Sequence, residues 1–297
     1  MDRVVSSGYD AAFVLQCFMI VSVSRRCDIP RFQFDWFMER VNEGFAEVTN
    51  PYNSRQIKRV PLVAAGEGIK PEDGVDLFVF WTRDPRHILA NADELTKRGF
   101  RFYVMATVTG YPNALEPDMA CTSEALAAMK ELARKIGADR VIWRYDPILL
   151  TSVTDEDFHR RNFSGLAQEL AGSARRVIIS IYDEYGEAKK RLEGLEKTGH
   201  LRILDSGGDL SGLLSGLAKT AEDAGMEMQS CAEKEDFSSL GIKPGACIDA
   251  VLIKELFGLE LGGKDKYQRP HCLCCKSVDI GAYGTCDAHC AYCYAWR

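Results

Sequence analysis

The sequence lacks an excess of positive charge. Its 297 residues include 37 Lys and Arg against 43 Asp and Glu, which gives a formal net charge of −6. Nonspecific nucleic-acid binding depends on a basic face that neutralises phosphates. A nucleic acid is therefore not the main partner that this composition predicts, although the same charge balance leaves room for a local basic pocket.

The glycine loops of nucleotide-binding proteins are missing as well. No Gly-x-Gly-x-x-Gly follows the first expected strand, and the chain contains no P-loop sequence. In such loops the backbone approaches the phosphates closely. Gly207-Gly208 and Gly262-Gly263 are isolated pairs of the kind found in turns. Nucleotide binding through these motifs therefore has no support.

No apolar run near the N-terminus is long enough to span a bilayer. The stretch from Ala11 to Val23 is too short. Arg25 and Arg26 follow it in place of a small-residue cleavage site, which argues against a secretory signal. We therefore expect no membrane partner and a cytoplasmic location.

Histidines are few, and none has the spacing of a histidine metal site. Cysteines are abundant instead: the chain has 11, and six of them lie between Cys272 and Cys293. A disulfide scaffold would distribute its cysteines through a short secreted chain. In a reducing compartment, such a cluster is more typical of a metal or iron–sulfur site.

Alternating apolar and helix-like segments predict an α/β protein with a parallel sheet. Near-continuous apolar runs are typical of strands that are covered on both faces. Strands are expected at residues 20–24, 77–81, 102–108, 140–143, 177–181, 226–230 and 278–282. Helices are expected at residues 31–43, 85–98, 122–136, 155–170 and 210–224. This number of units favours a full or partial (β/α) barrel, with a doubly wound open sheet as the alternative.

The C-terminal segment contains the most informative motif. Cys286, Cys290 and Cys293 have the spacing Cys-x3-Cys-x2-Cys, and Tyr292 directly precedes the last of them. Three thiolates on one short loop can hold three irons of a four-iron cluster, which leaves the fourth iron open to a small ligand. The expected strand just before this loop strengthens the interpretation.

This segment resembles the cysteine motif of the radical S-adenosylmethionine (SAM) enzymes. In that family the motif follows the first strand of a (β/α) barrel, and the resemblance implies a [4Fe-4S] cluster whose open iron binds SAM. Here the motif ends the chain instead of beginning it. If strand 278–282 takes the place of the first barrel strand, the chain is a circularly permuted radical SAM barrel. We expect an N-terminal extension at residues 1–18 and a single barrel domain at residues 19–297. The C-terminal part of this domain, residues 231–297, is a cysteine-rich segment.

Polar residues follow the ends of several expected strands, and in parallel barrels those ends form the active site. The candidate catalytic residues are Arg144, Asp146 and Glu233, and the candidate cofactor-binding residues are Ser24, Arg25, Arg26, Asp28 and Thr109. Arginines can hold the carboxylates of SAM or substrate by paired hydrogen bonds. Acidic side chains can accept the SAM ammonium or ribose hydroxyls. The alternative is that these residues are helix caps and turn residues, where Asp and Thr are common.

Residues 19–295 also resemble a more specific group, the uncharacterised prokaryotic family known as domain of unknown function 1848. The matching stretches are Ile20–Pro30, Asn50–Asn53, Phe80–Thr82, Thr109–Tyr111, Arg144–Ile148, Cys231–Glu233, Gly245–Asp249, Lys264–Lys266, Ser277–Gly281 and the terminal cysteines. The family has threonine at the position of Cys27, so this cysteine is not expected to be a required ligand. The resemblance implies a radical SAM-like barrel and brings no substrate.

A second set of cysteines precedes the C-terminal motif. We predict a four-cysteine site from Cys231, Cys247, Cys272 and Cys274, with Cys275 as the reserve ligand. Four thiolates can hold either an iron–sulfur cluster or a zinc ion. The alternative is that Cys231 and Cys247 are small buried apolar residues, which is a frequent role of free cysteine.

Two functions of different classes follow from these motifs. The first is a radical SAM-type enzyme that cleaves SAM and generates a radical on an unknown small-molecule or peptide substrate. It requires an electron donor such as ferredoxin or flavodoxin, and a variant of it transfers an aminocarboxypropyl group. The alternative is a non-catalytic zinc or iron–sulfur protein that acts as a binding module.

Overall fold

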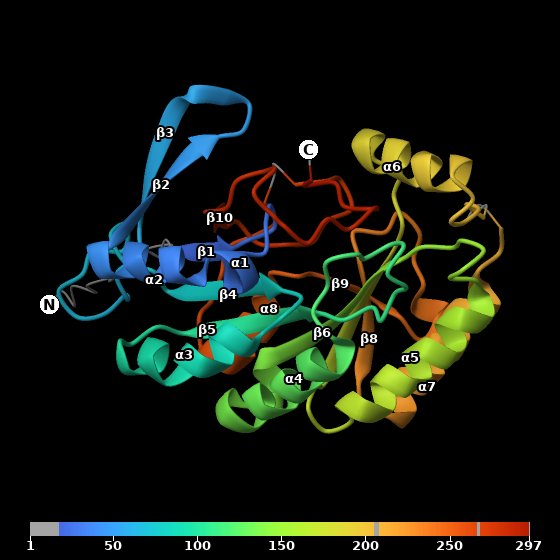
Figure 1. Cartoon of the computed structure of the whole chain (residues 1–297). Helices are drawn as coiled ribbons and strands as arrows, with labels where there is room; N and C mark the ends of the chain where they lie inside the picture. Colours follow the sequence, from blue (N-terminus) through green and yellow to red (C-terminus); the bar gives the residue numbers. More distant parts are fainter. Residues whose placement is uncertain (1–17, 205–207, 266–267, 297) are drawn as a thin grey trace, which may run out of the picture.

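The computed structural model describes residues 18–204, 208–265 and 268–296. An eight-stranded parallel sheet runs through it, flanked by helices (Figure 1). Its strands are β1 (Ile20–Val23), β4 (Leu77–Thr82), β5 (Phe102–Thr107), β6 (Val141–Ile148), β7 (Arg176–Ile181), β8 (Glu227–Cys231), β9 (Lys243–Gly245) and β10 (Val278–Asp279). The helices are α1 (Ile29–Phe32), α2 (Phe34–Glu43), α3 (Arg86–Lys97), α4 (Thr122–Ile136), α5 (Glu156–Leu170), α6 (Gly186–Lys197), α7 (Ser211–Asp223) and α8 (Ala250–Phe257). The α/β class is thus confirmed.

Each of the seven expected strands corresponds to a strand of this sheet. The expected helix at residues 31–43 is divided in two, because Gln33 has a φ of −137° and so separates α1 from α2. The sequence patterns missed β9, α6, α8 and a hairpin made of β2 (Phe45–Asn50) and β3 (Asn53–Pro61). The proposed extension at residues 1–18 lies, apart from Phe18, outside the described residues.

The order of the strands places the end of the chain beside its beginning. The sheet runs β10-β1-β4-β5-β6-β7-β8-β9, so that only β10 departs from the order of the chain. β10 pairs parallel to β1, with Val21 opposite Val278 and Ser22 opposite Asp279. Because both strands point the same way, the loops that follow them emerge at the same edge of the sheet.

Successive residues of each strand point to opposite faces of the sheet. In β4, Phe78 and Phe80 belong to the core beneath the helices, whereas Leu77, Val79 and Trp81 belong to a second core on the other face. Every residue of β4 and of β5 is buried. The near-continuous apolar runs in the sequence therefore reflect strands covered on both faces.

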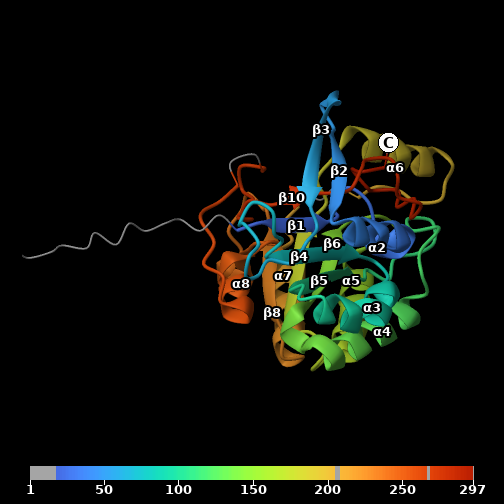
Figure 2. The ribbon, with the colours of Figure 1, turned by 90° about the vertical axis from the view of Figure 1, so that its left-hand side faces the viewer.

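The second face is covered by the cysteine-rich segment and not by a layer of long helices. Leu252 and Ile253 of α8 lie in the same buried cluster as Cys231, Cys247 and other residues of this segment. Figure 2 shows α8 on one side of the strands and α2, α3 and α4 on the other. The cysteine-rich segment is thus part of the core.

A third, smaller core lies beneath the C-terminal cysteine loop. It contains Leu115, Leu149 and Leu192 together with Cys290 and Tyr292 of the loop. Arg191 of α6 reinforces this contact, since its guanidinium donates to the backbone carbonyls of residues 291, 293 and 296. The red C-terminal loop accordingly lies beside α6 in Figure 1.

The β2–β3 hairpin extends away from the sheet (Figures 1 and 2). Seven consecutive residues of β3, from Asn53 to Arg59, are exposed, and burial is confined to the base of the hairpin at Ala46 and Val60. The hairpin therefore lacks the long buried face that an alternating apolar pattern would reveal. Among the described residues, no helix is long and apolar enough to cross a membrane.

Gly281 provides the first testable prediction, because it lies where β10 meets the loop after β1. A Cβ atom at this position would lie 2.0 Å from Oγ and 2.6 Å from Cβ of Ser24, and 2.8 Å from Sγ of Cys27. We expect Gly281→Ala to lower the free energy of unfolding by about 1–3 kcal/mol, as overpacking of a tight site does. Urea denaturation measures this change.

The matched control for this prediction is Gly262→Ala, where an added Cβ would meet no atom within 4 Å. This control should leave the unfolding midpoint nearly unchanged. Equal midpoints for both variants would contradict the tight approach of β10 to the loop after β1.

Candidate functional site

The carboxylate of Asp279 organises the junction between β10 and the loop after β1. This buried side chain accepts hydrogen bonds from Ser22 Oγ at 2.8 Å and from Ser24 Oγ at 2.7 Å. It also accepts the backbone N–H groups of Arg25 at 2.7 Å and of Gly281 at 3.0 Å. Four donors from two segments distant in sequence therefore converge on one carboxylate.

Three of the predicted cofactor-binding residues lie around this carboxylate. Beyond the bond from Ser24, the guanidinium Nε atoms of Arg25 and Arg26 lie 3.7 and 3.9 Å from Asp279. Arg25 also donates to Ser277 Oγ at 3.0 Å, and Arg26 to the carbonyl of Gly281 at 3.3 Å. The structure therefore groups these residues and gives each of them a partner within the protein.

A second buried centre is formed by Arg83 and Glu116. Nη1 of Arg83 donates to Glu116 at 2.8 Å and to Thr109 Oγ1 at 3.2 Å. Thr109 Oγ1 in turn donates to Glu116 at 2.5 Å. Tyr292 of the cysteine loop accepts from Nη2 of Arg83 and donates its hydroxyl to Glu116. This network fixes one side of the cysteine loop to the loops after β4 and β5.

Asp28 connects the two centres. Its carboxylate accepts the backbone N–H of Arg31 at 3.1 Å, as the N-cap of α1, and the backbone N–H of Arg83 at 2.7 Å. Burial raises its pKa to about 6, although these hydrogen bonds oppose the shift. Burial raises the pKa of the Cys286 thiol, and the nearby negative charge of Asp28 adds to the rise.

The three cysteines of the C-terminal motif lie on one compact loop. The backbone N–H of Cys293 donates to the carbonyl of Cys290 at 3.0 Å, and His289 adopts a positive φ of 47° between Cys286 and Cys290. Burial raises the pKa of Cys290 to about 12, partly offset by the positive charge of Arg83, and the other two thiols contribute to the rise. The three thiols are thus within electrostatic reach of one another.

The predicted catalytic residues lie along the rim from β6 to β8. Arg144 donates to Asp146 at 2.5 Å, and its guanidinium carbon lies 5.0 Å from the centre of the Trp81 ring. Nε of Arg144 is buried and has no hydrogen-bond partner among the described residues. Glu233 accepts the backbone N–H of Ile181 at 2.8 Å, and burial raises its pKa to about 7.

The rim and the C-terminal loop lie at the same end of the sheet. Tyr294 donates its hydroxyl to the carbonyl of Arg25 at 2.6 Å. Burial raises the pKa of Tyr294, the thiol of Cys293 raises it further, and the guanidinium of Arg144 opposes the rise. Tyr294 is therefore within electrostatic reach of both groups, and the cysteine loop and Arg144 share one rim.

The second set of cysteines is also brought together. Sγ of Cys231 lies 3.2 Å from Sγ of Cys247, and the backbone N–H of Ile248 points to Sγ of Cys274 at 3.4 Å. Hydrogen bonds from the thiols of Cys247 and Cys272 lower the pKa of Cys274. The four predicted ligands thus form one connected group of free thiols.

Within the described ranges, no three His, Cys, Asp or Glu side chains are positioned to hold a metal ion as they stand. A four-iron cluster on the C-terminal motif does not require three ligands around one ion, because each thiolate of such a cluster binds a different iron. The donor set itself is suited to iron: three thiols on one loop, with a buried guanidinium nearby.

Sequence reasoning missed several residues of this site. Asp279 lies inside an expected strand, where an acidic residue on the covered face signals a buried hydrogen-bonding role. Arg83 and Glu116 follow the ends of β4 and β5, and the position of Arg83 just after an apolar strand was the available signal. Nothing in the sequence indicated that Glu116, deep in a loop, would be its partner.

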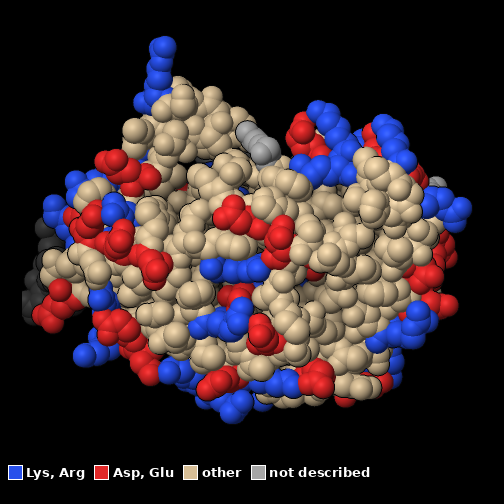
Figure 3. All heavy atoms as spheres, in the orientation of Figure 1, with Lys and Arg blue, Asp and Glu red and all other residues tan. Residues whose placement is uncertain are grey.

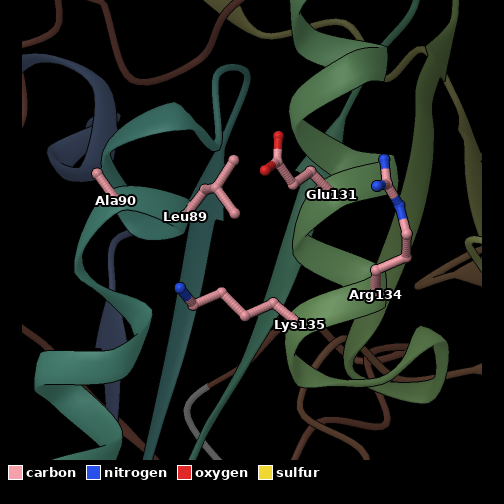
Figure 4. Close-up of a pocket in the computed structure, with 5 residues that line it drawn as sticks. All are labelled: Leu89, Ala90, Glu131, Arg134 and Lys135. Atoms are coloured by element: carbon pink, nitrogen blue, oxygen red, sulfur yellow. The ribbon is translucent and has the colours of Figure 1, made fainter.

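Two surface pockets lie away from this rim. Figure 4 shows one that is lined by Leu89 and Ala90 of α3 and by Glu131, Arg134 and Lys135 of α4. A neighbouring pocket is lined by residues of α4 and by Glu169 of α5. Neither contains a candidate residue, and Figure 3 shows basic and acidic side chains interspersed over the face in view.

Comparison with known proteins identifies a family. The family model described as "Domain of unknown function (DUF1848)" matches residues 20–295. No curated protein matches the chain. The match covers both cysteine groups and the whole rim.

The Arg83–Glu116 pair gives the second testable prediction. Glu116→Ala removes the carboxylate that compensates the buried guanidinium of Arg83. We expect a loss of about 3–5 kcal/mol in the free energy of unfolding, because an unpaired buried charge is costly. Chemical denaturation monitored by circular dichroism measures it.

The control is Glu94→Ala, which breaks the exposed ion pair with Arg98. Exposed pairs contribute little, so this variant should behave as the wild type does. A Glu116→Ala variant as stable as this control would show that Arg83 is compensated by other groups.

Proposed function

The chain belongs to the DUF1848 family, and on that premise we propose that it is a radical SAM-type enzyme. In this proposal Cys286, Cys290 and Cys293 hold a [4Fe-4S] cluster. The observation that carries the proposal is the place of the cysteine loop: it follows β10, the strand that precedes β1 in the sheet. A three-thiolate loop after the first strand in spatial order is the arrangement that the resemblance to the radical SAM enzymes implies.

The order of the strands supports a circularly permuted, partial (β/α) barrel. From β10 through β1 and β4 to β9, all strands are parallel and no reversal of direction occurs along the sheet. A doubly wound sheet would instead reverse its order at a switch point. The cores also fit a barrel-like arrangement, because the helices α2 to α5 cover one face and the cysteine-rich segment fills the other.

When bound, the cluster would supply the electron that cleaves the sulfonium of SAM into methionine and a 5′-deoxyadenosyl radical. The tasks of the chain are to bind, to orient and to exclude water. Asp279 fixes the backbone of Arg25 and Gly281, and so sets the two loops beside the cysteines. Tyr292, held by Arg83 and Glu116, seals the inner side of the cysteine loop.

Positive charge at the rim favours an anionic group of SAM or of the substrate. Arg144 is the candidate with a free donor, because its Nη2 bonds Asp146 while its buried Nε has no partner among the described residues. A carboxylate that accepted this N–H would satisfy a buried donor that is otherwise costly to leave unpaired. Glu233, with a pKa of about 7, is suited to gain or lose a proton near neutral pH.

Replacing Cys286, Cys290 and Cys293 by alanine tests the cluster assignment. After anaerobic reconstitution with iron and sulfide, we expect the wild type to show a reduced-cluster electron paramagnetic resonance signal that changes when SAM is added. The triple variant should lack this signal, because its three iron ligands are gone. Cys121→Ala, at an exposed cysteine, should retain it. A SAM-responsive signal in the triple variant would refute the assignment, and a wild-type cluster without any response to SAM would favour the non-catalytic binding module.

Arg144→Gln tests the ligand-binding role of the rim. We expect the affinity of the reconstituted protein for SAM to fall about tenfold or more, as loss of a charge-assisted hydrogen bond does. The iron content should stay unchanged. Isothermal titration under anaerobic conditions measures the affinity.

The control for this variant is Arg175→Gln, which removes an exposed arginine that pairs with Asp139. It should bind SAM as the wild type does. Unchanged SAM affinity in Arg144→Gln would reduce Arg144 to a structural partner of Asp146.

A further inference from the structure

We propose that Cys231, Cys247, Cys272 and Cys274 bind a single divalent metal ion of the zinc type, in a site separate from the C-terminal motif. This site does not depend on the proposed radical chemistry. Its ligands come from three places in the chain: the end of β8, the loop between β9 and α8, and the segment before β10. All four thiols are buried and free of disulfides.

The geometry of the thiols favours one ion over a cluster. Metal–sulfur bonds of about 2.3 Å in a tetrahedron place the sulfurs about 3.8 Å apart. The Sγ atoms of Cys231 and Cys247 lie 3.2 Å apart, so they must separate slightly to share one ion. The thiolates of a four-iron cluster are held farther apart, since each binds its own iron.

The remaining thiols extend this pair. Cys274 is hydrogen-bonded to the thiols of both Cys247 and Cys272. No three of the four are positioned to hold an ion as they stand. For the four thiols to bind one ion, their side chains must rotate. In cysteine this is a rotation about χ1 alone, between staggered positions. The backbone N–H of Ile248, 3.4 Å from Sγ of Cys274, provides the kind of donor that stabilises a metal-bound thiolate.

The surrounding charges suit a thiolate site. Four thiolates and one divalent ion carry a net charge of −2, which is costly to bury without compensation. The thiols lie within electrostatic reach of three arginines. Cys274 and Cys247 act on Arg25, Cys247 and Cys231 on Arg144, and Cys231 and Cys272 on Arg269.

The role that follows is structural. Four protein ligands leave no open coordination position, unlike a catalytic zinc site. The segment that carries them covers one face of the sheet. Among its described residues between β8 and β10, the regular elements are the three-residue β9, a short 3₁₀ turn and the eight-residue α8. An ion that joins three places in this segment would contribute its binding free energy to folding.

Cys275 supplies a matched control within the same segment. It is buried and adjacent to Cys274, and its backbone N–H donates to the carbonyl of Ile248 at 2.9 Å. Its thiol lies near the backbone N–H of Ala250 and takes no part in the hydrogen bonds that link the other four. The geometry thus selects Cys274 over Cys275 as the ligand.

The experiment uses the full-length chain with Cys286, Cys290 and Cys293 replaced by alanine, so that the C-terminal motif cannot take up metal. We expect about one zinc ion per chain by mass spectrometry of the metals, with no acid-labile sulfide. Adding Cys274→Ser should reduce the zinc content about tenfold or more, whereas adding Cys275→Ser should leave it unchanged. Replacement of zinc by cobalt should give the absorption of a tetrahedral thiolate site.

A second measurement needs no substituted ligand, in case Cys274→Ser fails to fold. Removal of the metal from the background protein by a chelator should make four additional thiols reactive toward a thiol reagent, and zinc should protect them again. The proposal is overturned by a background protein that holds no metal, by labile sulfide at this site, by an octahedral cobalt spectrum, or by loss of zinc in the Cys275→Ser variant. Failure of this site would leave the cluster proposal for the C-terminal motif standing, because the two are measured on different cysteines.

Discussion

The buried carboxylate of Asp279 is the interaction on which the arrangement of the rim depends. β10 has only two residues, and a strand so short provides few ladder hydrogen bonds of its own. Asp279 compensates by accepting four hydrogen bonds, three of them from β1 and the loop after it. A buried carboxylate is tolerated only when its oxygens accept hydrogen bonds. Here the donors belong to the two segments that must lie together, namely β1 with the loop after it and the segment that follows Asp279. One side chain thus fixes the place of the cysteine loop relative to Arg25 and Arg26.

The other side of the cysteine loop depends on a second buried charge. Arg83 and Glu116 would each be unfavourable alone, and together with Tyr292 and Thr109 they form a closed set of hydrogen bonds. The loop is therefore anchored on one side through Asp279 of the preceding strand and on the other through the hydrogen bonds of Tyr292, while Arg191 of α6 donates to its backbone carbonyls. Such attachment gives an irregular segment the rigidity that a binding site requires.

The sequence predicted seven of the eight strands of the main sheet, and for a physical reason: strands buried on both faces must be apolar throughout, as β4 and β5 are. The β2–β3 hairpin was not predicted because few of its residues are buried. Helix α6 was not predicted because only Ala188 and Leu192 of its twelve residues are buried. The candidate rim residues were found from their places after strands. Their partners were not, because Asp279 and Glu116 meet Ser24 and Arg83 across long stretches of chain that no local pattern connects.

The distribution of charge links the two cysteine groups. The chain carries a net charge of −6, yet its rim contains four arginines. Arg25 and Arg26 share the carboxylate of Asp279, whereas Arg83 pairs with Glu116 and Arg144 with Asp146. These groups together carry no excess of negative charge. Converting nearby thiols to metal-bound thiolates adds negative charge on both sides of the rim, next to guanidinium groups that are already desolvated and already oriented. Burial alone keeps cysteines protonated, as the raised pKa of Cys290 shows. Arginines placed beside them lower the cost of the thiolate form. The arginines beside the two cysteine groups would therefore favour the thiolate form that the proposed metal sites require.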